Sequence, residues 1–252
     1  MKNIFTKIAT GAVTSTALSV AIAVDVPTAS AASLFIANHG FEETILEEGG
    51  YTYREPIPGW QIYDPNNLFA NGNSNYSVFN AVEASYPGGI VAEGNNVGAI
   101  FLANEVGSGV AGFSQILGDV LTAGKAYTLK VNIGDPFPDE YTGEGFPGYA
   151  VQLLAGGQVI AEDFNTQSFN PGTFITSTVS YTASANDNYL GQALEIRLLN
   201  VLTGTGKEVN FDNVRLDATS VPEPTSIFGL LGLGAFGAVS AFKKKRTSSQ
   251  RG

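Results

Sequence analysis

The chain has 252 residues, no cysteine, one histidine and a formal net charge of −10. The lack of cysteine excludes a disulfide framework, a thiolate nucleophile and a Cys-ligated zinc site, and a single histidine excludes a multi-histidine metal centre. Between residues 33 and 220, six basic residues stand against 21 acidic ones, and the resulting net charge of −15 repels phosphate backbones, so we expect no nucleic-acid partner.

The first 31 residues have the features of a removable signal peptide. Two lysines lie among the first seven residues, an uncharged run follows from Ile8 to Val24, and Ala29-Ser30-Ala31 has the small-residue form of a cleavage site. We therefore expect cleavage after Ala31 and export of the remaining chain. The alternative, an N-terminal membrane anchor, requires a longer and more apolar run.

Residues 32–220 are predicted to form one all-β domain, because short alternating apolar and polar runs recur between turn residues and no long helical periodicity is present. In residues 126–133 the apolar side chains fall on one face of a half-buried strand. Many strands without intervening helices predict an antiparallel jelly-roll β-sandwich. Further strands are expected at 97–102, 149–154, 159–162, 174–181 and 194–198, with a hairpin turn at Gly156-Gly157.

Two segments are predicted to be long loops. Residues 66–75 are rich in Asn and Gly, and residues 135–148 combine aromatic residues with Pro and Gly. Long loops on a rigid sandwich are where binding sites usually lie. We therefore expect a ligand to bind between these two loops.

Two motifs near the ends of the domain carry carboxylates, one in residues 38–42 and the other in residues 210–216. The first and last strands of a closed sandwich are often neighbours, so Glu42 and Asp212 are predicted to lie together. Two carboxylates beside turn carbonyls form an oxygen-rich pocket that suits Ca²⁺. The alternative is that both are ordinary surface carboxylates without a ligand.

The only tryptophan, Trp60, follows Pro58-Gly59 in a predicted turn. A rigid aromatic ring at such a position can stack on a sugar or an indole ring. It can equally fill the end of the core. Phe137 and Phe146 are flanked by prolines, an arrangement that holds exposed rings but also occurs in ordinary rigid loops.

Four segments of the domain carry a resemblance to a known family: "NHGFEE", "IPGWQIYDP", "GFPGY" and "VNFDNVRL". The domain resembles the carbohydrate-binding-module-type sandwiches of exported bacterial proteins and, among these, most closely the Stig cyclases of cyanobacterial indole alkaloid biosynthesis. The resemblance extends over nearly all of residues 33–220. It implies a jelly-roll sandwich that is stabilised by calcium and tends to form a homodimer. It also implies an aromatic-lined pocket in which an aspartic acid promotes rearrangement and cyclisation of an isoprenylated indole.

The resemblance assigns roles to individual positions. It implies that Glu42 and Asp212 are calcium ligands. The catalytic acid of the cyclases lies two residues before the calcium-binding aspartate, and this position is Asn210 here. An amide cannot protonate a substrate as a carboxylic acid can, so the chain departs from the family pattern at its central residue.

The resemblance also implies a set of residues that contact the ligand. They share an aromatic side chain and lie in segments that resemble the walls of the cyclase pocket. They are Trp60, Phe79, Phe137 and Phe146.

Residues 221–252 are predicted to be a sorting tail. Pro222-Glu223-Pro224 is followed by an uncharged apolar stretch at 227–242 and then by the basic cluster at 243–246. This order predicts a short transmembrane helix with its basic end in the cytoplasm. It resembles the PEP-CTERM signal, which implies an exosortase partner and residence in the inner membrane before processing. The alternative is a permanent one-pass anchor.

These observations leave three functional hypotheses. The leading one is a non-catalytic, calcium-stabilised envelope protein that binds a glycan or another extracellular polymer. The second is a cyclase-type enzyme that acts on a small hydrophobic substrate. The third is a structural surface protein without a pocket.

Overall fold

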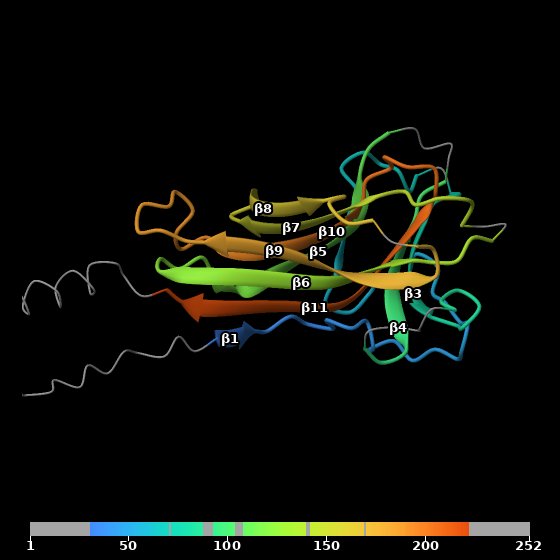
Figure 1. The fold of residues 1–252 in the computed structure, drawn as a ribbon, viewed down its shortest axis with the longest axis horizontal. Coiled ribbons are helices and arrows are strands. Elements are labelled where there is room, and N and C mark those ends of the chain that lie inside the picture. The colour runs from blue at the N-terminus through green and yellow to red at the C-terminus, as the bar shows by residue number, and fades with distance from the viewer. Residues whose placement is uncertain are drawn as a thin grey trace, which may run out of the picture.

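The computed structural model describes residues 31–70, 72–87, 93–103, 108–139, 142–168 and 170–221. These residues form a β-sandwich, seen edge-on in Figure 1. The strands are β1 (Ala31–Leu34), β2 (Gln61–Tyr63), β3 (Asn75–Asn80), β4 (Asn96–Phe101), β5 (Ala111–Val120), β6 (Lys125–Asp135), β7 (Tyr149–Ala155), β8 (Gln158–Phe164), β9 (Thr173–Thr182), β10 (Ala193–Asn200) and β11 (Glu208–Ser220).

The strands form two sheets in which every paired neighbour is antiparallel. The first sheet has the order β3-β4-β11-β6-β9, with β1 paired beside the far part of β11. The second has the order β2-β5-β10-β7-β8. The predicted all-β antiparallel sandwich is therefore confirmed.

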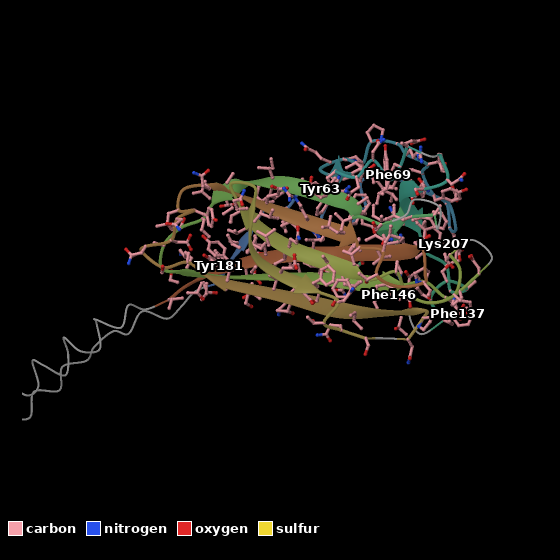
Figure 2. All side chains as sticks on the ribbon, turned by 90° about the horizontal axis from the view of Figure 1, so that it is seen from above. Tyr63, Phe69, Phe137, Phe146, Tyr181 and Lys207 are labelled. Carbon is pink, nitrogen blue, oxygen red and sulfur yellow. The ribbon has the colours of Figure 1, made fainter. Side chains whose placement is uncertain are left out.

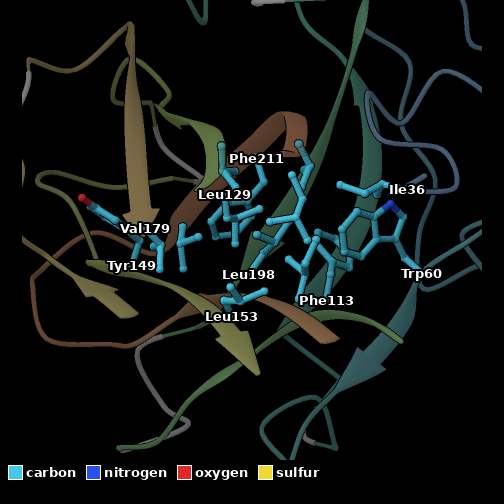
Figure 3. Packing of buried hydrophobic residues seen from close by; sticks show 14 of the residues in the cluster. Ile36, Trp60, Phe113, Leu129, Tyr149, Leu153, Val179, Leu198 and Phe211 are labelled. Carbon is cyan, nitrogen blue, oxygen red and sulfur yellow. The ribbon is translucent and has the colours of Figure 1, made fainter. Parts of the chain in front are cut away.

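Apolar residues from the inner faces of both sheets form one core (Figure 3). Leu129 on β6 and Phe211 on β11 face Leu153 on β7 and Leu198 on β10, and all four are fully buried. The rings of Phe113 and Phe211 meet edge to face between the sheets, with 6.5 Å between their centroids. The alternation read from the sequence is the cause, since every second residue of a strand points to the same face.

Each strand predicted from alternation is present, and Gly156-Gly157 connects β7 to β8 as expected. Strand β5 was not predicted, because Gly112 and Gly118 interrupt its apolar pattern. Gly112 has a packing reason to be glycine: a Cβ atom there would lie 1.9 Å from the backbone oxygen of Leu198 on the neighbouring strand. Gly112 thus allows the backbones of β5 and β10 to approach closely, and the same glycine breaks the apolar pattern by which β5 could have been predicted.

Several sequence predictions fall outside the described residues. These are the signal peptide up to residue 30, the Pro222-Glu223-Pro224 triplet and the expected transmembrane segment at 227–242. Within the part of the chain that the structure describes, no helix is long and apolar enough to cross a membrane. Ala31, the expected cleavage residue, is the first residue of β1 and pairs with Thr219 of β11.

A buried carboxylate joins the edges of the two sheets. Asp163 on β8 is 5% exposed and accepts hydrogen bonds from Ser177 Oγ on β9 at 2.5 Å and Tyr149 Oη on β7 at 2.9 Å. Thr166 Oγ1 donates a third at 2.6 Å. Burial alone would raise the pKa of Asp163, but the hydrogen bonds from Ser177, Thr166 and Tyr149 outweigh it, and the pKa is lowered.

Replacement Asp163→Ala is expected to destabilise the domain by roughly 2 to 4 kcal/mol, because it leaves buried hydroxyl groups without an acceptor. Urea unfolding at neutral pH measures the effect. Glu162→Ala is the matched control, since the neighbouring Glu162 is exposed and bonds only Gln152; this change is expected to cost about 0.5 kcal/mol or less. Equal effects of the two replacements would contradict the bridging role of Asp163.

Candidate functional site

A cavity of about 550 Å³ lies on the outer face of the first sheet, at the end formed by β3, β4 and the start of β11. The alternation that buries Val78, Ile100 and Val209 in the core turns their neighbours outward into this cavity. Two loops complete the walls, one ending at Asn73 and the other beginning at Pro136. The cavity is therefore flanked by the two predicted loops, as the sequence led us to expect.

Strand register arranges the floor of the cavity in two rows that run across the strands. Asn75, Phe101 and Glu208 form the first row, on β3, β4 and β11. The second row runs from Ser77 through Ala99 and Asn210 to Gly134 and Phe174. Asn210 thus lies between Ala99, which lines the cavity, and Gly134, above which Tyr86 and Phe174 pack, and Asn210 itself is fully buried beside the cavity.

Aromatic rings surround the mouth of the cavity. Tyr51, Tyr53 and Phe137 line it and are 63%, 53% and 52% exposed. Phe79 and Phe101 contribute further rings from the sheet itself. Figure 2 shows Phe137 at the same end of the sandwich as Lys207 and far from Tyr181. Exposed rings gathered at one cavity mouth are typical of a site that binds an apolar ligand.

A hydrogen-bonded chain of polar groups borders this cavity. Tyr86 Oη donates to Asn210 Oδ1 at 2.5 Å, and Asn210 Nδ2 donates to Glu208 Oε1 at 2.8 Å. The pKa of Glu208 is raised to about 7, mainly by burial; the hydrogen bond from Asn210 lowers it, and the charge of Asp139 raises it. Burial, followed by the charges of Glu208, Asp135 and Asp212, raises the pKa of Tyr86, so the phenol stays protonated and can donate.

Tyr86 is held in place by packing. Its ring lies against Phe174, with 4.4 Å between the centroids, and it is fully buried. Tyr86 and Phe174 can pack here only because residue 134 is glycine: a Cβ atom at Gly134 would lie 2.6 Å from Tyr86 Oη and 2.5 Å from the Phe174 ring. The orientation of the Asn210 amide is therefore fixed through Tyr86.

The structure separates the four aromatic residues that were expected to contact a ligand. Phe79 and Phe137 line the cavity. Phe146 packs near Tyr149 and lines a second, smaller hollow with Asn165 and Thr203.

Trp60 is 5% exposed and lies in the core, stacked on Phe41 with 5.4 Å between the ring centroids (Figure 3). Its Nε1 donates to the backbone oxygen of Asn38 at 3.0 Å. A ring that is 5% exposed matches the alternative in which Trp60 fills the core and does not match stacking on a ligand.

Glu42 and Asp212 lie on either side of the turn at residues 93–96. Glu42 Oε1 accepts hydrogen bonds from the backbone nitrogens of Asn95 and Asn96 at 2.9 and 2.7 Å. Asp212 Oδ2 accepts one from the backbone nitrogen of Glu93 at 3.0 Å. The pKa of Asp212 is raised to about 7, mainly by burial; hydrogen bonds from the backbone nitrogens of Asn213 and Glu93 lower it, and the charges of Glu93 and Glu42 raise it.

The donor chemistry of this region fits a hard cation. Glu42, Glu93 and Asp212 all border the turn at residues 93–96, and a Cβ atom added to Gly40 would lie 3.4 Å from Glu93 Oε2 and 3.6 Å from Asp212 Oδ1. Oxygen ligands of this kind are those that Ca²⁺ prefers. Among the described residues, however, no three or more His, Cys, Asp or Glu side chains are arranged as a ready metal-binding group.

Sequence reasoning missed Glu208, Tyr86 and Glu93. A signal for Glu208 was present, because residues 208, 210 and 212 share one face of a strand and only two of them were considered. Tyr86 and Glu93 lie in segments without regular structure, where spacing carries no information about position.

The antiparallel sandwich and the aromatic-walled cavity on its outer face agree with the class of small-molecule cyclases that the four sequence segments resemble. The chain belongs to the HpiC1 cyclase family, whose model matches residues 32–217. The PEP-CTERM protein-sorting motif matches residues 220–246. That motif indicates export, anchoring at the C-terminal end in a membrane and processing by an exosortase. No curated protein matches the chain.

Solved structures of cyclases from Fischerella are similar over the whole domain. A Stig cyclase, Fisc, from Fischerella sp. TAU in complex with (3Z)-3-(1-methyl-2-pyrrolidinylidene)-3H-indole is 42% identical, with a TM-score of 0.71, over 77% of this chain and 100% of that one. A Fischerella sp. TAU cyclase in complex with 4-(1H-indol-3-yl)butan-2-one is also 42% identical, with a TM-score of 0.71, over 76% and 100% of the two chains. An apo cyclase from Fischerella sp. is 41% identical, with a TM-score of 0.72, over 77% and 99%.

Asp135, the last residue of β6, is a further buried acid next to the cavity. It is 4% exposed, and burial raises its pKa from 3.8 to about 7. The unfolded state therefore loses this proton before the folded state does as the pH rises. The domain consequently loses stability between about pH 4 and pH 7 on account of this group.

Replacement Asp135→Asn is expected to raise stability at about pH 8 by up to about 4 kcal/mol, the value that corresponds to the shift in pKa. The gain should become small near pH 3, where the carboxyl is mostly protonated in both states. Urea unfolding at the two pH values measures the difference, with Asp119→Asn on β5, partly exposed, as control. A gain that is the same at both pH values would contradict burial of a charged group as its cause.

Proposed function

We propose that this protein is an exported enzyme of the Stig-cyclase type, which binds a small indole-containing substrate in the outer-face cavity and promotes its cyclisation. The observation that carries the proposal is the combination of aromatic walls with a partly buried, protonatable carboxyl at the cavity floor. Apolar walls with few polar groups are the usual composition of a small-molecule site.

The size of the cavity supports a small ligand. A volume of about 550 Å³ lies within the usual range of roughly 300 to 1,000 Å³ for such sites. The solved relatives carry indole compounds of this size class. The leading expectation from the sequence, a glycan or other extracellular polymer as ligand, finds no support in the family match, which favours the cyclase hypothesis.

One polar group of the cavity suits an indole in particular. Asn75 lines the cavity, and its Oδ1 is buried without a hydrogen-bond partner among the described residues. A buried acceptor without a donor is costly and calls for a partner. An indole N–H is a donor of this kind.

A bound Ca²⁺ is part of the proposal as a structural ion. Glu42, Glu93 and Asp212 would hold it and join the start of the domain to β11. The cation would offset the mutual repulsion of these carboxylates, which come from segments distant in the chain.

Ligand binding tests the proposed function directly. The purified domain is expected to bind 4-(1H-indol-3-yl)butan-2-one in isothermal titration calorimetry, and Phe79→Ala and Phe137→Ala should each weaken binding by about tenfold or more, since each removes a ring worth about 1.4 kcal/mol or more. Phe164→Ala is the matched control, because this ring is 46% exposed but lies on β8 of the other sheet. Lack of binding by the wild-type domain would overturn the proposal.

Removal of calcium is expected to lower the melting temperature. A cation that binds only the folded state adds about 2.7 kcal/mol at a hundredfold excess over Kd, which is about 5 to 11 °C for a domain of this size. Scanning calorimetry with chelator and after re-addition of Ca²⁺ measures the change, and Asp212→Ala should abolish most of it. The same melting temperature in all samples would make Glu42 and Asp212 carboxylates without a metal.

A further inference from the structure

We infer that Glu208 supplies the catalytic proton in this protein and that Asn210, at the position of the family's acid, orients it. The inference rests on the proposed function and names the group that performs it. It concerns a residue two positions away from the one that family resemblance singles out.

Glu208 lies where its carboxyl can reach a ligand in the cavity. It lines the cavity floor in the cross-strand row of Asn75 and Phe101. Asn210 Nδ2 donates to Glu208 Oε1, and among the described residues no donor is recorded for Oε2. One oxygen is therefore held by the protein, and the other is left to carry a proton toward a ligand.

The amide of Asn210 is oriented so that it donates to Glu208. Tyr86 Oη donates to Asn210 Oδ1, so the amide nitrogen must face Glu208. Tyr86 in turn packs on Phe174 above Gly134. An aspartate at position 210 would place a second acid against Glu208, whereas the amide supplies a donor, so the pair Glu208 and Asn210 is chemically consistent in a way that two acids are not.

The charges around Glu208 favour its protonated form near neutral pH. Asp139 lines the same cavity and raises the pKa of Glu208, in addition to burial. The other titratable groups near it are Tyr51 and Tyr53 in the cavity wall, Tyr86 behind Asn210, and Lys207, whose Nζ lies 5.8 Å from the Phe101 ring centroid. A general acid is most effective when its pKa is near the working pH.

The proton that Glu208 donates in the proposed cyclisation returns to it at the end. The O–H bond of Glu208 breaks, and the proton bonds to a basic atom of the bound isoprenylated indole. The electron pair of an isoprenyl double bond then attacks the cation and forms the new ring bond. The cyclised cation loses a proton to the Glu208 carboxylate, so the reaction is an isomerisation that consumes no proton and no co-reactant.

The displacement of the acid along β11 has a consequence for the product. Residues two apart on a strand are separated by about 6.5 Å, so the donor stands closer to Phe101 and Asn75 than an acid at position 210 would. A different part of the folded substrate is therefore protonated. The double replacement Glu208→Gln/Asn210→Asp returns the acid to position 210 and is expected to change the distribution of cyclised isomers.

The test measures cyclisation of an isoprenylated indole isonitrile by wild type, Glu208→Gln, Glu208→Asp and the double variant, with binding of 4-(1H-indol-3-yl)butan-2-one measured in parallel. Glu208→Gln is expected to lower the rate by about 10²- to 10⁴-fold and to change binding little. Glu208→Asp should retain part of the rate. The wild-type rate should fall as the pH rises through about 7, and the residual rate of Glu208→Gln should not. Glu162→Gln on β8 is the control.

The outcomes separate a wrong assignment of Glu208 from a wrong proposed function. A Glu208→Gln rate equal to that of wild type overturns the assignment, as does a wild-type protein that binds the indole ketone but does not cyclise the isonitrile. A wild-type protein that does not bind the ketone overturns the proposed function itself. If Glu208→Gln fails to fold, as judged by its melting curve, the pH profile of wild type and the rate of Glu208→Asp decide in its place.

Discussion

The two-residue alternation of β11 is the constraint on which the rest of the molecule depends. This strand is paired on both sides, with β4 and β6. A change in its register, or in which of its side chains point into the core, would therefore break the hydrogen bonds of the sheet. Val209 and Phe211 point into the core, and Glu208, Asn210 and Asp212 consequently point outward. The same packing that stabilises the sandwich thus holds three polar side chains in a fixed line, one serving the cavity, one the orientation of its neighbour and one the turn at residue 93.

Burial of polar groups is what distinguishes this line from an ordinary outer sheet face. Desolvation is the largest cause of the raised pKa of Glu208 and of Asp212. Such a cost is tolerated where it prepares a group for chemistry or for a cation. By contrast, Asp163 at the edge between the sheets is matched by hydroxyl donors and has a lowered pKa. Asp163 thus stabilises the fold in its charged form, whereas burial disfavours the charged forms of Glu208 and Asp212.

Much of the fold could be predicted from the sequence, because alternation in β6, β9 and β10 reports burial directly. Strand β5 could not, since its glycines serve backbone approach rather than burial. For the site, Phe79, Phe137 and residues of the two predicted loops line the cavity, whereas Trp60 was expected at the ligand and lies in the core. The prediction for Trp60 failed because the Pro58-Gly59 turn fixes the backbone before the ring but does not determine whether the ring points to solvent or into the core. Glu208 was missed although its two-residue spacing from Asn210 places both on one face of β11; the hydrogen bond between them and the burial that raises the pKa of Glu208 follow from the folded structure and are not visible in the sequence.

The adjacency of β1 and β11 fixes where the domain is tethered. β11 has thirteen residues from Glu208 to Ser220, so it spans about 40 Å at about 3.3 Å per residue. Its last residues pair with Ala31 and Ala32 at the end remote from the cavity (Figure 1), and the sorting motif begins at residue 220. The tail therefore leaves the domain at the end of the sandwich opposite the cavity. The stretch of chain that the sorting motif anchors and the residues that line the cavity are separated by the length of β11.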